Sequence, residues 1–293
     1  MEYRSFGNTG LNVSAVGFGA GHIGLPGMDD HHAIQLLNGI LDSGINLIDT
    51  ARSYGASEQR IGKYLAHRRH EFILSTKVGY SFQDKPDWSF EATMGTIDEA
   101  LMLMKTDYLD VVHLHSCDKW VLEQGDAVDA LEKARDQGKI RVIAYSGEND
   151  ALEYAIASNR FGSIQCSVNI FDQRSINHYL PQASKKSMGI IAKRPLANAV
   201  WRYSTRPDGH GHAAYWDRLH QMSIVQEDPD WNDLALRFTA YTPGIDTMIV
   251  GTSSLEHLKE NIKFFEKGPL TEAVFSQIHA AFTNHDQNWV GLV

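Results

Sequence analysis

The chain has 293 residues, of which 43% are hydrophobic, and a formal net charge of −9. This length suits two ordinary domains or one large domain such as a barrel of about 250 residues. Nucleic acid and anionic membrane surfaces both favour a basic protein face, so the acidic balance argues against either as a main partner.

The amino-terminal stretch MEYRSFGN lacks the basic start and long apolar run of a signal peptide, and the chain has two cysteines, Cys117 and Cys166. No stretch approaches the roughly 18 uninterrupted apolar residues that a membrane-spanning helix requires. These features predict a cytoplasmic protein with reduced thiols and no membrane segment.

The elements follow a regular order along the chain. Residues 3–14, YRSFGNTGLNVS, are expected to form a hairpin around a Gly-Asn-Thr-Gly turn. Eight apolar runs follow, separated by helical patterns, at residues 16–18, 45–49, 72–78, 108–115, 140–146, 163–168, 189–192 and 247–250. The count favours a closed α/β (β/α)8 TIM barrel over an open doubly wound sheet. We therefore expect a single barrel domain over residues 1–293, capped at its lower end by the hairpin.

Residues 197–230 follow the seventh run and are long for a connection, with aromatic side chains at Trp201, Tyr203, Tyr215 and Trp216. Because an insertion on such a connection lies at the catalytic face of a barrel, this segment is a candidate substrate lid. The alternative is a helix packed on the barrel wall by its aromatic side chains. Its HGH sequence, residues 210–212, is interpreted as a solvated loop rather than a metal site.

Residues 19–24, GAGHIG, match the G-x-G-x-x-G pattern of dinucleotide-binding turns. The following Leu25-Pro26-Gly27 would break the helix that must point at the pyrophosphate. We therefore interpret these glycines as the upper loop of the first barrel strand, where Gly19 lets the chain pass close to a nicotinamide or a substrate.

Asp49 and Lys77 lie near the carboxyl ends of adjacent predicted strands, where buried opposite charges are expected to pair. Tyr54 follows on the loop that leaves the first of these strands. An adjacent ammonium favours loss of a phenolic proton, so Lys77 would activate Tyr54 while Asp49 keeps Lys77 charged. A lysine at this position is also what a Schiff-base aldolase would use as its nucleophile, although the Asp49 partner opposes loss of the lysine proton.

His113 and His115 share one face of the fourth predicted strand. Such a pair can bind metal in barrel hydrolases, but the later strands supply no further histidine ligand. We expect no metal, His115 as a neutral hydrogen-bond donor or proton relay beside Tyr54, and His113 as a buried, hydrogen-bonded barrel residue.

Four separated motifs, LIDTARSYG, LSTKVG, YLDVVHLH and IVGTSSLEHLKENI, resemble those of the aldo-keto reductases in order and spacing, over essentially the whole chain. The resemblance implies an NAD(P)H-dependent enzyme that interconverts a carbonyl (an aldehyde, ketone or sugar) and an alcohol. It implies Tyr54 as general acid, Asp49 and Lys77 as its tuning pair, and His115 as the group that orients the substrate carbonyl. A small molecule is the expected partner, and no partner protein is indicated.

The resemblance also implies where the cofactor binds. The family positions around the adenosine end correspond to Gly251, Thr252, Ser253, His257 and Asn261, and those at the nicotinamide carboxamide correspond to Ser146 and Gln165. NADP(H) is favoured because it is commoner in the family, and NAD(H) is the alternative because the adenosine segment lacks an Arg or Lys for a 2′-phosphate. Ser253 and Glu256 are expected to form a capping box that opens the helix after the eighth strand.

The chain departs from the family at two places. Gly147 stands where many relatives have Asn, and Lys193 and Arg194 stand where relatives stack an aromatic ring on the nicotinamide. Lys193 and Arg194 are still expected to contact the cofactor. A second alternative to a reductase is a cofactor-sensing regulatory subunit, similar to the potassium-channel β subunits, with a partner protein and little turnover.

Overall fold

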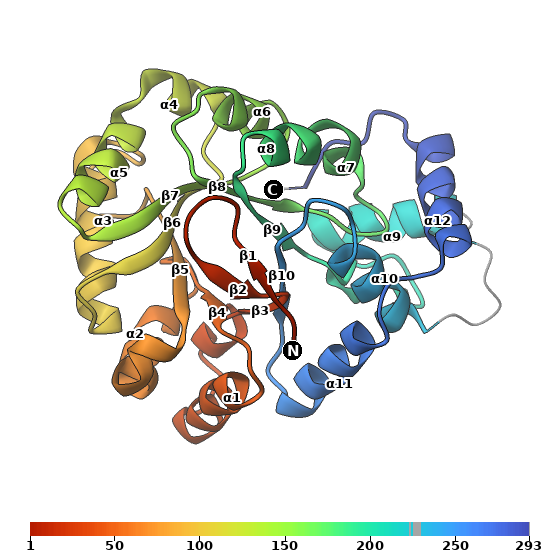
Figure 1. Cartoon of the computed structure of the whole chain (residues 1–293), viewed down its shortest axis with the longest axis horizontal. Helices are drawn as coiled ribbons and strands as arrows, with labels where there is room; N and C mark the ends of the chain where they lie inside the picture. The colour runs from red at the N-terminus through yellow and green to blue at the C-terminus, as the bar shows by residue number, and fades with distance from the viewer. Residues whose placement is uncertain (223, 225–229, 293) are drawn as a thin grey trace.

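The computed structural model describes residues 1–222, 224 and 230–292, and its centre is a closed barrel of eight parallel strands (Figure 1). The strands pair in the order β10-β3-β4-β5-β6-β7-β8-β9. Their bounds are β3 (Val16–Gly19), β4 (Leu47–Asp49), β5 (Ile73–Val78), β6 (Leu109–His115), β7 (Ile140–Ser146), β8 (Ser163–Ser167), β9 (Gly189–Lys193) and β10 (Thr247–Gly251). The predicted eight strands and barrel closure are confirmed, with strand ends shifted by at most about two residues.

The amino-terminal hairpin is also confirmed: β1 (Tyr3–Ser5) pairs antiparallel with β2 (Asn12–Ser14), in front of the barrel in Figure 1. Phe6, Leu11 and Val13 are buried in the lower barrel interior, in one apolar cluster with inward residues of the strands. A Cβ atom on Gly189 would lie 2.6 Å from the Phe6 ring. The hairpin therefore closes the lower end by filling it with side chains.

Helices cover the outside of the barrel and connect its strands (Figure 1). The α-helices that lie between β3 and β10 along the chain are α1 (Asp30–Asp42), α2 (Ser57–Leu65), α3 (Phe90–Met104), α4 (Lys119–Gln124), α5 (Asp126–Asp136), α6 (Asn149–Ala157), α7 (Arg174–His178), α8 (Leu180–Lys185), α9 (His210–Met222) and α10 (Trp231–Ala240). α11 (Leu255–Glu266) and α12 (Glu272–His285) follow β10, and shorter 3-10 turns are η1 (His22–Gly24), η2 (Ala66–Glu71) and η3 (Ala197–Arg202). Among the described helices, none has the length and apolar content to cross a membrane.

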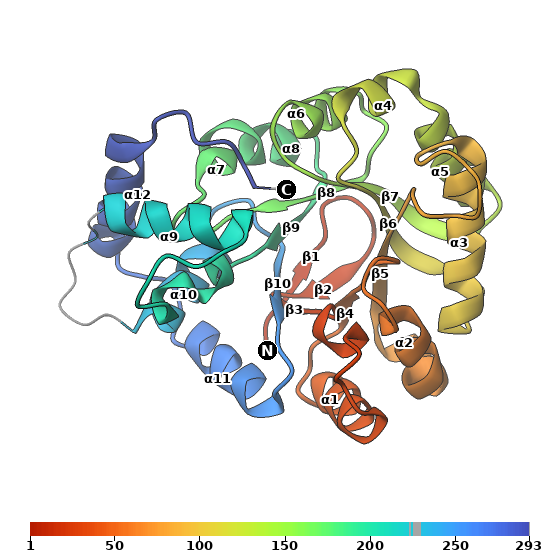
Figure 2. The same ribbon diagram turned by 180° about the vertical axis from the view of Figure 1, so that it is seen from behind.

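The described part of residues 197–230 packs beside the barrel rather than lying free. α9 contacts η3 and α12, and Figure 2 shows α9 and α12 to one side of the strands. Tyr215 is fully buried in a second apolar cluster, and Trp201 stacks on Trp231 with ring centroids 5.9 Å apart. This agrees with the packed-helix alternative; the lid role stays a prediction, and residues 223 and 225–229 lie outside the described residues. The solvated loop expected at HGH is wrong, because His210 begins α9.

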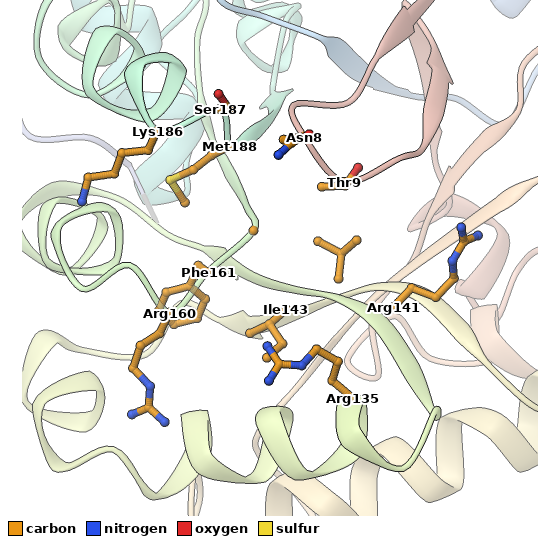
Figure 3. Close-up of a pocket in the computed structure, with 12 residues that line it drawn as sticks. Asn8, Thr9, Arg135, Arg141, Ile143, Arg160, Phe161, Lys186, Ser187 and Met188 are labelled. Carbon is orange, nitrogen blue, oxygen red and sulfur yellow. The ribbon is translucent and has the colours of Figure 1, made fainter.

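A surface pocket lies at the amino-terminal end of the barrel, beside the turn of the hairpin (Figure 3). Its lining includes Thr9, Arg141 at the start of β7, and Met188 just before β9. Barrel enzymes build their active sites at the opposite end, where the strands finish. The functional site is therefore expected at the carboxyl ends of the strands.

Candidate active site

The barrel interior changes character from its lower to its upper end. The lower layer is apolar, with Leu47, Ile73, Val111, Val142 and Ile191 packed under the hairpin. Side chains two or four residues further along each strand point the same way, into the upper interior. This alternation places eight of the predicted site residues on the inward face, namely Gly19, Asp49, Lys77, His115, Ser146, Gln165, Lys193 and Gly251.

The expected Asp49–Lys77 pair forms in the centre of this upper layer. The Lys77 Nζ donates to Asp49 Oδ2 at 2.5 Å and to the Thr50 carbonyl at 2.8 Å, and both charged side chains are at most 2% exposed. Asp49 Oδ1 also accepts from Ser75 and Gln165. Burial alone would lower the pKa of Lys77, but the charge of Asp49 and the interactions with Tyr54 raise it above its ordinary value. The pair is therefore ionised, as a buried ion pair with extra hydrogen bonds should be.

Tyr54 lies next to this pair on the loop between β4 and α2. Its ring centroid is 5.0 Å from the Lys77 ammonium, and its ring meets that of His115 edge-on with centroids 6.2 Å apart. The glycine-rich loop supports it from the other side, because a Cβ on Gly24 would lie 1.6 Å from the Tyr54 carbonyl oxygen. Gly24 thus allows a backbone contact that fixes the position of Tyr54.

The two histidines of β6 occupy different layers. His113 is fully buried, and its Nε2 is 3.1 Å from the Ser75 hydroxyl, while its Nδ1 has no hydrogen bond to any described residue. The expectation that His113 is fully hydrogen-bonded is therefore only half met. Burial and the charges of Lys77 and Lys193 lower the pKa of His115 to about 3, so its ring is neutral. Within the described ranges, no group of three His, Cys, Asp or Glu is arranged to bind a metal ion.

Tyr80 is a site residue that the sequence reasoning missed. Its hydroxyl lies 2.6 Å from His115 Nδ1, and the two rings lie 5.4 Å apart between centroids. Tyr80 follows Lys77 by three residues on the loop that leaves β5. The sequence feature that could have identified Tyr80 is an aromatic residue close to the end of the strand that carries Lys77.

Ser146 and Gln165 lie on the opposite wall of the upper interior. The Ser146 hydroxyl donates to Gln165 Oε1 at 2.9 Å, and the Gln165 amide donates to Asp49 at 3.1 Å. One layer above Gln165, the buried Ser167 hydroxyl has no hydrogen-bond partner in the described part of the chain. An unsatisfied buried hydroxyl beside a fixed amide suits a polar ligand such as a carboxamide, so these residues fit the nicotinamide end of the implied cofactor.

The two departures from the family pattern are structurally explained. A Cβ on Gly147 would lie 2.2 Å from the Tyr145 hydroxyl, which itself donates to the Cys117 carbonyl. The Lys193 ammonium pairs with the buried Glu148 carboxylate at 3.1 Å, and the Arg194 guanidinium donates to the Leu292 carbonyl. Cofactor contacts by Lys193 and Arg194 stay predictions.

The segment from Gly251 to α11 carries the remaining predicted cofactor residues. The predicted capping box is wrong by one residue: Ser254, not Ser253, is the N-cap, and its side chain accepts from the His257 amide. The Thr252 hydroxyl accepts from the Ser254 amide just before the helix begins. Among the predicted contacts, Ser253 and His257 are exposed, whereas Thr252 and Asn261 are buried. The start of α11, shortly after β10, still suits an anion, because its amides and the positive end of the helix dipole point outward there.

A closed parallel barrel with an ion pair, a tyrosine and a neutral histidine at its carboxyl end has the architecture of a barrel enzyme. The profile of the Aldo/keto reductase family matches residues 15–282, and the chain belongs to this family. The prediction of family, fold and oxidoreductase class is thereby confirmed. Members of the family use nicotinamide cofactors and act on small-molecule carbonyl substrates.

Individual relatives extend over most of the chain. L-galactose dehydrogenase of Arabidopsis thaliana is 30% identical over 281 residues, covering 89% of this chain and 87% of its own. D-threo-aldose 1-dehydrogenase of a Pseudomonas species is 25% identical, with 87% and 90% covered. The holo structure of aldo-keto reductase AKR11C1 from Bacillus halodurans superimposes with a TM-score of 0.83 at 27% identity, with 96% of each chain covered.

Proposed function

We propose that this protein is a nicotinamide-dependent oxidoreductase that interconverts a small carbonyl compound and its alcohol, with Tyr54 as general acid and base. The single observation that carries the proposal is the cluster of Tyr54, the ionised Lys77–Asp49 pair and neutral His115 at one barrel end. Each member supplies one requirement of carbonyl reduction.

Tyr54 transfers the proton. In the reductive direction its hydroxyl gives a proton to the carbonyl oxygen as the carbon gains a hydride, so the C=O π bond is replaced by one C–H and one O–H bond. The Lys77 ammonium stabilises the phenolate that remains until water returns the proton. Asp49 keeps Lys77 charged and in place.

His115 orients the substrate. A neutral imidazole carries one N–H group, and a donor beside Tyr54 holds the carbonyl oxygen by a second hydrogen bond. Because burial keeps its pKa at about 3, His115 does this without a competing positive charge across the working range of pH.

The cofactor would lie across the barrel mouth. Ser146, Gln165 and Gly19 would hold the nicotinamide end, with Lys193 and Arg194 beside it. Gly251, Thr252, Ser253, His257 and Asn261 would hold the adenosine end. When bound, the reduced nicotinamide supplies the hydride for the carbonyl carbon. We propose NADP(H) as the preferred cofactor, with NAD(H) as the alternative to be tested against it.

A sugar is the proposed substrate class. Two relatives that match most of the chain carry the names L-galactose dehydrogenase and D-threo-aldose 1-dehydrogenase. The dissociation constants of NADPH and NADH, measured by fluorescence titration, should be followed by turnover assays on aldoses, other aldehydes and ketones in both directions.

The decisive variant is Tyr54→Phe, which keeps the ring and removes the proton donor. General acid catalysis is worth about 10² to 10⁴ in rate, so kcat should fall by that factor while the Kd of the cofactor stays near the wild-type value. Tyr241→Phe is the matched control, because its half-buried hydroxyl donates to the Phe265 carbonyl, away from the site. Unchanged turnover in Tyr54→Phe would overturn the proposal.

The same assays separate the two alternatives. A regulatory subunit would bind cofactor tightly and turn over no substrate on the panel. A Schiff-base aldolase would be trapped on its substrate by borohydride without nicotinamide. We do not expect trapping, because Asp49 raises the pKa of Lys77 against the effect of burial, and a Schiff-base lysine must lose its proton.

A further inference from the structure

The loop after β5 brings a second tyrosine into contact with the site. The Tyr80 hydroxyl lies 2.6 Å from Nδ1 of His115, a short hydrogen-bond distance, and the rings are tilted by 30°. No hydrogen bond joins Nε2 of His115 to any residue in the described part of the chain. Tyr80 therefore engages one ring nitrogen and leaves the other for the site.

The loop holds Tyr80 in place by packing. Trp88 meets the Tyr80 ring edge-on with centroids 6.0 Å apart, and its amide donates to the Gly79 carbonyl. Gly79 has a φ of +121°, and a Cβ there would lie 2.6 Å from the Trp88 ring. The ring of Tyr80 is thus confined between Trp88 and His115.

The direction of the Tyr80–His115 bond determines what His115 can do. A neutral imidazole has one N–H, so if Nδ1 accepts a hydrogen bond from the Tyr80 hydroxyl, the N–H must lie on Nε2. If Nδ1 instead donates to Tyr80, Nε2 becomes an acceptor and offers nothing to a carbonyl oxygen. Burial raises the pKa of Tyr80 although hydrogen bonding to Ser53 opposes this, so Tyr80 keeps its proton at neutral pH.

We propose that Tyr80 is a positioning residue for the reaction: its hydroxyl donates to Nδ1 of His115 and fixes the ring with its N–H on Nε2, available to the substrate oxygen. This inference rests on the proposed function only for the expected effect of Tyr80 on turnover. The tautomer itself is a property of the protein alone.

The groups around His115 favour this arrangement. Lys77 on β5 and Lys193 on β9 contribute positive charge at the ring, while Asp49 on β4 opposes them and His113 lies one layer below on β6. Asp87, on the same loop as Tyr80, adds a negative charge near the phenol. Burial, together with the charges of Lys77 and Lys193, keeps the ring neutral, and a neutral ring needs a partner to select one tautomer.

The first test is nitrogen NMR of the whole protein labelled with ¹⁵N-histidine, without cofactor. Protonated and unprotonated ring nitrogens give separate signals, and the His115 signals are assigned as those lost in His115→Gln. We expect Nδ1 unprotonated and hydrogen-bonded and Nε2 protonated. A protonated Nδ1 in the wild-type protein would overturn the proposal, whatever the activity.

The second test is Tyr80→Phe, which keeps the ring between Trp88 and His115 and removes the hydroxyl. We expect the two tautomers to mix in the NMR spectrum. By analogy with groups that orient metal-bound histidines, whose loss costs 10- to 100-fold, we expect kcat to fall about tenfold with unchanged cofactor Kd. Tyr241→Phe removes a comparable bonded hydroxyl elsewhere and should change neither the tautomer nor kcat.

A double-mutant cycle with His115→Gln completes the test, because residues acting through one another are not additive. Tyr80→Phe should have no further effect on kcat once His115 is Gln. Full additivity would overturn the proposal. Failure of the proposed function would show instead as absent turnover with the expected tautomer intact.

Discussion

The barrel mouth contains two lysine–carboxylate pairs on opposite sides, one fully buried and one partly exposed. The Tyr54 side, made of Asp49, Tyr54, Lys77 and His115, has a pair separated by 2.5 Å with both side chains at most 2% exposed. The Lys193 side, made of Gly147, Glu148, Lys193 and Arg194, has a pair separated by 3.1 Å in which Lys193 is 13% exposed.

The neighbours of each pair differ more than the pairs themselves. Lys77 lies 5.0 Å from the centre of a tyrosine ring, whereas Glu148 accepts a second hydrogen bond from the Ser167 amide. A buried ion pair is by itself weak support for catalysis, because structural networks also bury such pairs. A titratable side chain beside the ion pair, rather than the ion pair itself, therefore distinguishes the side that we propose to be catalytic from the Lys193 side.

The largest expected effect comes from breaking each pair in the same way. Lys77→Met leaves Asp49 buried without its partner, which should lower the free energy of unfolding by about 3–5 kcal/mol. It should also reduce kcat by about 10²- to 10⁴-fold, because Tyr54 loses its activating charge. Urea denaturation and steady-state kinetics measure the two effects.

Lys193→Met is the matched variant. It should destabilise the protein less, because Lys193 is partly exposed, and leave kcat near wild type. If Lys193 contacts the cofactor, the Kd of NADPH should rise about tenfold, equivalent to about 1.4 kcal/mol. Equal losses of kcat in both variants would remove the distinction between the two sides.

A smaller effect is expected at Gly147 on the Lys193 side. Gly147→Ala places a Cβ against the Tyr145 hydroxyl, and overpacking of this kind costs about 1–3 kcal/mol. Gly27→Ala is the control, because no atom lies within 4 Å of its added Cβ. If Gly147→Ala unfolds at the same urea concentration as Gly27→Ala, the contact with Tyr145 does not explain why this chain has Gly147 where many relatives have Asn.

Sequence patterns predicted the Tyr54 side well for a physical reason. Its residues lie at the ends of successive strands or, for Tyr54, on the loop that follows one, and parallel strands bring those ends together at one rim of a barrel. The eight apolar runs predicted the strands because barrel strands are buried on both faces.

The Lys193 side and Tyr80 were not predictable in the same way. Glu148 lies on the connection after β7, whereas Lys193 ends β9, and no local pattern relates them. Tyr80 lies on a loop in which Ser81, Gln83 and Trp88 have positive φ angles. Residues of these types rarely adopt such angles, so the sequence does not predict the path of this loop. The helix start was misplaced because Ser253 and Ser254 are equally good caps in sequence.

The Tyr54 side also buries His113, which gives it a distinct pH dependence. Burial and the charge of Lys77 lower the pKa of His113 to about 3, although Asp49 opposes them. Histidine in the unfolded chain has a pKa near 6.5, so between these two pKa values the unfolded chain binds a proton at His113 that the folded protein does not. This contribution to stability is complete above about pH 6.5 and is lost as the pH falls toward 3.

His113→Gln should remove that term while an amide still reaches Ser75. Between pH 5.5 and 4.5 the wild type should lose about 1.4 kcal/mol more unfolding free energy than the variant. Urea denaturation at the two pH values measures this difference, with the exposed His31→Gln as control. Equal pH slopes in wild type and His113→Gln would mean that His113 is protonated in the folded state.

The smallest expected effect concerns the start of α11, between the two sides. Ser254→Ala removes the side chain that accepts from the His257 amide, and loss of such a cap typically costs about 1 kcal/mol. Ser253→Ala should cost only a few tenths of that, because the described Ser253 contact is made by its backbone carbonyl with His32. Thermal unfolding of both variants distinguishes them. An equal loss of stability in Ser253→Ala would mean that Ser253 and Glu256 form the capping box after all. Weaker binding of NADPH in Ser254→Ala alone would mean that the cap also orders the amides that face the cofactor.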